Sequence, residues 1–108
     1  MDQNTEMIAF NIILNSGNAR ATIHNAIKKG ARVNNFEVFD RLIAEAENEL
    51  HEAHNAQTQL LQDFAGGNNF TVDILMVHAQ DHLMTTMVFK ETAIELCELY
   101  KVINSLKK

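Results

Sequence analysis

The scarcity of helix-breaking residues is the feature that most restricts how this chain can fold. Its 108 residues include no proline and only four glycines. Because proline and glycine are the residues that most often interrupt helices, few positions here can end one. Gly30 and the pair Gly66 and Gly67 provide two breaks. They divide the chain into three segments, which we expect to form helices at about 4–31, 36–65 and 71–106.

The spacing of apolar residues also indicates helices. In the second segment these residues recur in steps of mostly three or four, which places them on one face of an α-helix. They include Phe39, Ile43, Ala46, Leu50, Ala53 and Leu60. A similar stripe follows the first segment, where Thr5 is the expected N-cap. We expect this first helix to continue through Ser16 and Gly17, with the glycine allowing close packing.

The third segment is apolar on nearly every side of a helical wheel. Its apolar residues include Leu75, Met76, Val77, Ala79, Leu83, Met84, Met87 and Val88. A helix of this kind is buried on nearly every side, but a bundle of three helices leaves each helix one face in solvent. We therefore predict a single domain over 1–108, an all-α antiparallel three-helix bundle that assembles with other copies through its last helix.

Composition excludes several classes of function. Nine Lys and Arg against 14 Asp and Glu give a net charge of −5, so no basic stripe neutralises phosphates and nucleic acid is not an expected partner. The single cysteine, Cys97, cannot form an internal disulfide and is expected to be buried. No apolar run approaches the roughly 20 residues of a membrane span, and no signal-peptide pattern is seen. We expect a cytoplasmic protein.

A polar group interrupts the apolar third segment. His78, Asp81, His82 and Thr85 share an arc of roughly 100° on one side of the expected helix. A carboxylate and two imidazoles are costly to bury unless they are paired or used. This group is therefore the candidate site.

The residues alone leave three interpretations of this group. It could be a polar layer between copies of a non-enzymatic helical scaffold or regulator. It could be a His/Asp metal-binding bundle site to which His51 and His54 add ligands, although the Glu-x-x-His of di-iron bundles is absent. It could also hold a histidine that carries a phosphoryl group, because a neutral imidazole nitrogen is a competent nucleophile. The chain lacks a phosphate-binding loop for a nucleotide, so another protein would have to load such a carrier.

Three blocks of the sequence resemble one known family. The stretch 77–87 reads Val-His-Ala-Gln-Asp-His-Leu-Met-Thr-Thr-Met and closely resembles the signature of the lactose/cellobiose family of phosphotransferase-system (PTS) IIA components. The stretches 53–58 and 16–20 are similar to two further blocks in the same order and spacing. The likeness spans essentially the whole chain. The wording Val-His-Ala-Gln is more similar to cellobiose or chitobiose members than to lactose members.

The resemblance implies an enzyme, a phosphotransferase with a phosphohistidine intermediate. Such a IIA component takes a phosphoryl group from the phosphocarrier protein HPr and passes it to a cysteine of the IIB component. IIB in turn supplies the IIC membrane permease during uptake of a β-linked disaccharide of the cellobiose, chitobiose or lactose type. The resemblance also implies that the three-helix protomer forms a homotrimer around its third helices.

The family pattern further implies a role for single residues. The first histidine of the signature, His78 here, carries the phosphoryl group. Asp81 approaches the trimer axis, where three copies share one divalent cation such as Mg²⁺. Gln80, His82 and His54 are the implied supports around the site.

Two partners must reach His78 in turn, so an apolar docking surface is expected around it. Met76, Leu83 and Met84 contribute to this surface if their side chains face outward. If they face inward, they belong to the core.

Overall fold

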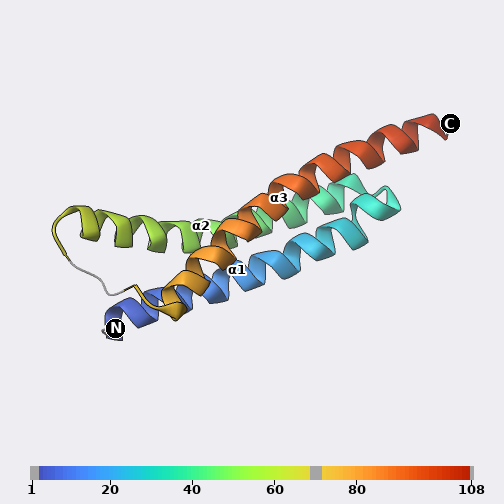
Figure 1. Ribbon diagram of the computed structural model, residues 1–108. Helices are drawn as coiled ribbons and strands as arrows, with labels where there is room; N and C mark the ends of the chain where they lie inside the picture. The colour runs from blue at the N-terminus through green and yellow to red at the C-terminus, as the bar shows by residue number, and fades with distance from the viewer. Residues whose placement is uncertain (1–2, 69–71, 108) are drawn as a thin grey trace.

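Three long helices form the protein (Figure 1). The computed structural model describes residues 3–68 and 72–107. Helix α1 spans Gln3–Lys29, α2 spans Phe36–Ala65 and α3 spans Ile74–Leu106, and a short 3₁₀ helix, η1, spans Ala31–Val33. Successive long helices run antiparallel and form an elongated bundle of 60 × 20 × 19 Å. The expected all-α three-helix fold is therefore confirmed.

The ends of the helices differ in part from those expected. Helix α1 continues through Ser16 and Gly17 as expected, but it ends at Lys29 because the chain turns into η1. Thr5 is not an N-cap, since it lies inside α1 with 2% of its surface exposed. Helix α3 begins at Ile74, because the Asp73 side chain accepts a hydrogen bond of 3.0 Å from the backbone N–H of Met76. Residue 71, the expected start, lies outside the described residues.

The turn between α1 and α2 depends on a glycine. Gly30 is buried, and a Cβ atom placed on it would lie 2.6 Å from the carbonyl oxygen of Ala26 and 2.7 Å from the backbone nitrogen of Phe39. These are backbone atoms, which cannot rotate away as a flexible side chain can. The absence of a side chain at Gly30 therefore lets α2 fold back closely against the end of α1.

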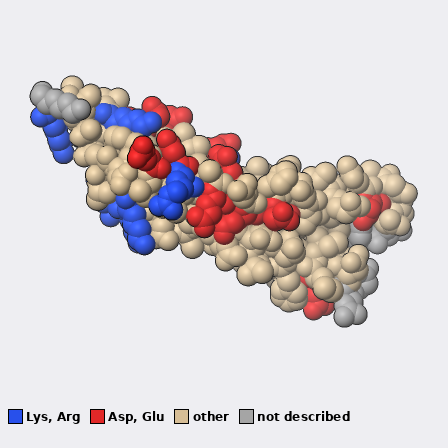
Figure 2. Space-filling model, turned by 180° about the vertical axis from the view of Figure 1, so that it is seen from behind, with Lys and Arg blue, Asp and Glu red and all other residues tan. Residues whose placement is uncertain are grey.

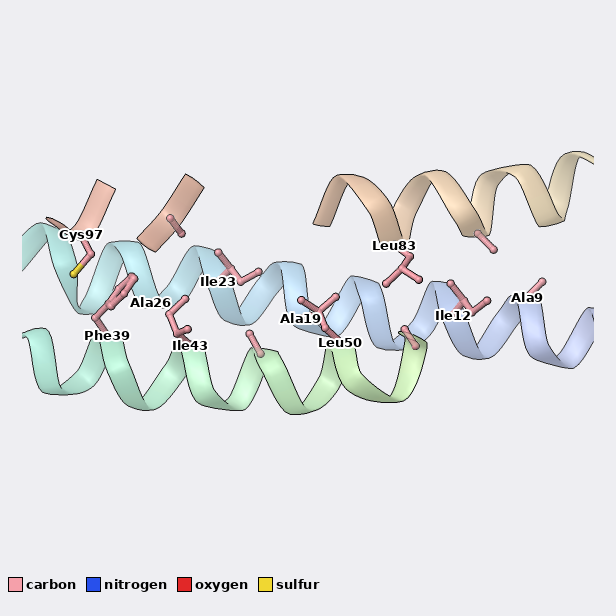
Figure 3. Close-up of a cluster of buried hydrophobic side chains, with 14 of the residues drawn as sticks. Ala9, Ile12, Ala19, Ile23, Ala26, Phe39, Ile43, Leu50, Leu83 and Cys97 are labelled. Atoms are coloured by element: carbon pink, nitrogen blue, oxygen red, sulfur yellow. The ribbon is translucent and has the colours of Figure 1, made fainter. Parts of the chain in front are cut away.

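Helix α1 is the centre of the packing. It contacts both other helices along its length, whereas α2 and α3 contact each other much less. The buried hydrophobic side chains come from all three helices (Figure 3). They include Ile12 and Ile23 of α1, Phe39, Ile43 and Leu50 of α2, and Leu83 and Cys97 of α3. The burial expected for Cys97 is confirmed, and this burial raises the pKa of its thiol.

The side of α3 that faces away from α1 carries an exposed apolar stripe, which we call the α3 stripe. Its side chains are between 36% and 88% exposed: Ile74, Val77, Met84, Val88, Leu96, Leu99, Ile103 and Leu106. Asp81 and Thr92 lie on the same side of the helix between them. Within one protomer, α3 is thus not buried on nearly every side. It has one apolar side in the core and a second in solvent.

Candidate functional site

His78 and His82 lie one turn apart near the start of α3. Their ring centroids are 5.8 Å apart, and the two rings are tilted by 50°. His78 is exposed, whereas His82 is half-buried against α1. A partner protein can therefore approach the His78 ring from solvent while His82 lies beside it. Both residues belong to a continuous helix, so their backbone positions are fixed relative to one another.

Arg20 of α1 reaches across to α3 just beyond these histidines. Its Nη2 donates hydrogen bonds to Thr85 Oγ1 at 2.6 Å and to Thr86 Oγ1 at 2.9 Å, and its Nε donates to Thr86 Oγ1 at 3.1 Å. Nη2 also donates to the carbonyl oxygen of His82 at 3.4 Å. One guanidinium group thus joins α1 to three oxygen atoms of a single turn of α3.

Gln80 and His54 lie on the other side of α3. Successive residues of a helix are separated by about 100°, so Gln80 points away from His78. It accepts a hydrogen bond from Gln57 of α2. His54 lines a hollow of about 300 Å³ together with Met87 and other residues of α2 and α3. Met87 is nine residues from His78, again on the opposite side. One protomer therefore brings His82 to His78, but not Gln80 or His54.

Asp81 is exposed and lies within the α3 stripe, between Val77 and Met84. Over residues 3–68 and 72–107, no three His, Cys, Asp or Glu side chains come close enough together to hold a metal ion. The hypothetical metal site, in which His51 and His54 add ligands to His78, Asp81 and His82, is thus not formed within the described part of a protomer.

Exposed apolar side chains lie near His78, together with the exposed carboxylate of Asp81 three residues along α3. Of the three candidates for a docking surface, Met84 is 48% exposed, but Met76 and Leu83 are buried in the core. Val77 is exposed beside His78 and also lines a hollow of about 380 Å³ between the end of α2 and the start of α3. Figure 2 shows that on the visible face the basic residues gather at the end that holds the α3 C-terminus, whereas the half with the start of α3 has few charges.

Sequence reasoning did not identify two of these interhelical contacts, Arg20 with the threonines and Gln57 with Gln80. The only signal for these contacts in the sequence is that both residues lie in stretches that resemble the family. Arg20 is the last residue of the block 16–20, and Gln57 belongs to the block 53–58. No helix in the described part of the chain has the length and hydrophobicity that a bilayer span requires.

Comparison with known proteins gives consistent matches over nearly the full length. The family model for the lactose/cellobiose-specific IIA subunit of the PTS matches residues 7–101. The lichenan-specific phosphotransferase enzyme IIA component of Bacillus subtilis is 43% identical over 103 residues, covering 95% of this chain and 93% of that protein.

Solved structures agree with this match. The crystal structure of PtcA from S. mutans has 50% sequence identity and a TM-score of 0.90, covering 94% of this chain and 98% of that one. The solution structure of a complex between IIA(Chitobiose) and HPr, from the N,N'-diacetylchitobiose branch of the Escherichia coli phosphotransferase system, has 35% identity and a TM-score of 0.79. It covers 92% of this chain and 95% of that one.

Proposed function

Since the chain belongs to the family of lactose/cellobiose-specific IIA subunits of the PTS, we propose that His78 carries the phosphoryl group between HPr and a IIB component. The family membership makes the protein a phosphotransferase component. The observation that carries the assignment to His78 is its exposed ring on a rigid helix within the family signature. The exposed apolar side chains nearby, Val77 and Met84, suit two partners that dock in turn.

The reaction consists of two transfers in which the protein supplies position rather than further covalent chemistry. In the first, a bond forms between phosphorus and a ring nitrogen of His78 as the bond between phosphorus and the HPr leaving group breaks. The second ring nitrogen of His78 gives up its proton as the leaving group takes one up. In the second transfer, the thiolate of a IIB cysteine attacks phosphorus, the bond to His78 breaks, and the imidazole regains its proton.

The complex of HPr with the chitobiose IIA relative supports HPr as the donor. The chitobiose relative also supports a β-linked disaccharide as the sugar that IIB and the IIC permease handle downstream. The IIA component does not contact this sugar in the proposed reaction. We place the transfer in the cytoplasm, where a IIA component and HPr would meet.

We assign the active form as a homotrimer packed through the α3 stripe. Eight exposed apolar side chains along one side of α3 are a strong reason for assembly. His78 lies toward one border of this stripe and Gln80 toward the other. In a threefold assembly each contact is head to tail, so opposite borders of neighbouring stripes meet. Gln80 and His54 of a second copy would then approach His78. They could support the site in this way, although within one protomer they lie on the opposite side of α3 from His78.

Asp81 lies within the stripe, so a threefold axis along it would bring three carboxylates together. Carboxylate oxygens are the ligands that hard divalent cations such as Mg²⁺ prefer. Three Asp81 side chains would offer such ligands, and the ion would neutralise their mutual repulsion. We propose this as the metal role of Asp81, with no part in the chemistry at His78.

Replacing Asp81 by leucine is expected to stabilise the metal-free trimer. The change removes three mutually repelling charges from an apolar interface and adds apolar surface to bury. We expect a gain of about 1–2 kcal/mol per protomer, which raises the melting temperature in chelator by roughly 5–10 °C. Glu52→Leu, at an exposed position of α2, is the matched control and should leave the melting temperature nearly unchanged. A lower melting temperature for Asp81→Leu would show that Asp81 instead makes a favourable pair.

The proposed function is tested by incubating the protein with phosphoenolpyruvate, enzyme I and HPr, and then measuring its intact mass. A gain of one phosphoryl group per chain is expected. Transfer of that group to a cognate IIB component completes the test. A chain that takes up no phosphoryl group would instead fit a non-enzymatic helical scaffold or regulator with the same fold.

A further inference from the structure

Two residues of α1 face the turn of α3 that contains His82. Gly17 lies opposite the imidazole, since a Cβ atom on Gly17 would be 3.7 Å from His82 Nε2. Arg20, one turn further along α1, makes four hydrogen-bonding contacts to His82, Thr85 and Thr86. The block Ser-Gly-Asn-Ala-Arg thus provides space for the His82 ring and, three residues later, a bridge to its backbone.

We propose that Arg20 is a positioning residue for phosphoryl transfer, which holds the 82–86 turn of α3 against α1 and so fixes the His82 imidazole beside His78. The inference rests on the proposed function of His78. Arg20 acts through His82, whose ring centroid is 5.8 Å from that of His78. We refer to the hydrogen bonds from Arg20 to the 82–86 turn as the Arg20 clamp.

The geometry of the hydroxyl groups explains why an arginine suits this position. Thr85 Oγ1 donates to the Asp81 carbonyl oxygen at 2.7 Å, and Thr86 Oγ1 donates to the His82 carbonyl oxygen at 2.7 Å. Each hydroxyl has then used its proton, so its oxygen is free to accept from the guanidinium group. The planar guanidinium presents donors in fixed directions and can reach both oxygens at once. A lysine ammonium is a point charge that lacks this fork.

The clamp also lies at a well-packed place. Thr86 is fully buried, and Arg20 is half-buried. Hydrogen bonds from a charged donor in such surroundings are stronger than those on an open surface. Removing the guanidinium would leave α3 free to shift or rotate slightly relative to α1. Because small misplacements of reacting groups slow transfer steeply, the effect should appear in the transfer step.

The test compares Arg20→Gln and Arg20→Lys with wild type in phosphoryl transfer from phospho-HPr. We expect Arg20→Gln to lower kcat by about tenfold while KM for phospho-HPr changes less than about twofold, because the docking surface is intact. Arg20→Lys should remain closer to Arg20→Gln than to wild type, since it keeps the charge but not the fork. Full activity in Arg20→Lys would overturn the clamp, because charge alone would then suffice.

Thr22→Val is the matched control for a purely structural role. Thr22 also lies on α1 and donates a hydrogen bond to another helix, but its acceptor is Glu49 Oε1 of α2, at 2.8 Å, and not an oxygen of the 82–86 turn. Transfer is measured below the melting temperature of every variant, with equal helix content. Thr22→Val should then transfer at the wild-type rate. An equal loss of kcat in Thr22→Val and Arg20→Gln would overturn the proposal.

A second measurement separates failure of this inference from failure of the proposed function. Histidine ring signals are recorded by nitrogen-edited NMR at one pH for wild type, Arg20→Gln and Thr22→Val. We expect the chemical shifts of the His82 ring to change in Arg20→Gln and to stay the same in Thr22→Val. The ring of His51, on α2, is the reference and should be unchanged in both variants. Unchanged His82 signals would overturn the clamp even if wild type accepts phosphate. If wild type accepts none, the proposed function fails, and the shift of His82 alone decides whether the clamp exists.

Discussion

His78→Gln is expected to abolish the gain of one phosphoryl group when the protein is incubated with phospho-HPr. Glutamine fills a similar space and can form hydrogen bonds, but its amide nitrogen has no available lone pair with which to attack phosphorus. His78 is exposed, so the substitution should leave the helix content and oligomeric state unchanged. Intact-mass measurement reads the result directly.

His82→Gln is the matched control, because His82 is the neighbouring histidine on the same helix, at 5.8 Å between ring centroids. It should still accept the phosphoryl group, but more slowly, since its expected role is support. The group on wild type should be labile in acid and stable in alkali, unlike phosphoserine. Uptake by His78→Gln with none by His82→Gln would reverse the two assignments. Normal uptake by both variants would mean that neither His78 nor His82 is the carrier, and His54 would be the next candidate.

Val88→Asp is expected to convert the proposed trimer into monomers at micromolar concentration. Val88 is 60% exposed in the protomer and lies at the middle of the α3 stripe. In the trimer, each substitution would bury an unpaired carboxylate near two others, at a cost of about 3 kcal/mol or more per copy. This cost weakens association at least about a hundredfold. Light scattering or analytical ultracentrifugation measures the mass.

Val33→Asp provides a control of the same residue type and the same exposure. Val33 is also 60% exposed, but it lies in η1, outside the stripe. The variant should keep the mass of the wild-type assembly. Two results would contradict the assembly proposed here. One is a wild-type protein that is monomeric at micromolar concentration, and the other is a Val88→Asp variant that remains a trimer.

The fold was predictable because its strongest signals are local. Steps of three and four residues define α2, which lies between Gly30 and Gly66 and has Asn35 as its N-cap. The start of α3 was less accessible, since Asp73 had to be identified as the capping residue rather than part of a loop. Thr5 shows the reverse error, in which a good capping residue lies inside a helix that starts earlier.

The site was predictable only where it depends on one helix. The 100° step places His78 and His82 on the same side of α3, and the structure agrees. The contacts of Arg20 join residues 62 to 66 positions apart in the chain. They depend on how α1 and α3 are rotated about their own axes, which no local pattern specifies. The same holds for Gln80, whose partner Gln57 is chosen by the packing of α2.

The division of polar residues between the two sides of α3 has a genetic consequence. If each site combines His78 of one copy with Gln80 of the next, then two chains that are each defective alone can form an active site together in a mixed trimer. A His78→Gln chain lacks the acceptor, and a Gln80→Ala chain lacks its support, but a mixed trimer contains a site with both residues intact. Co-expression should therefore restore more transfer than either chain gives alone. Strictly additive activities in mixed trimers would mean that each site is contained within a single chain.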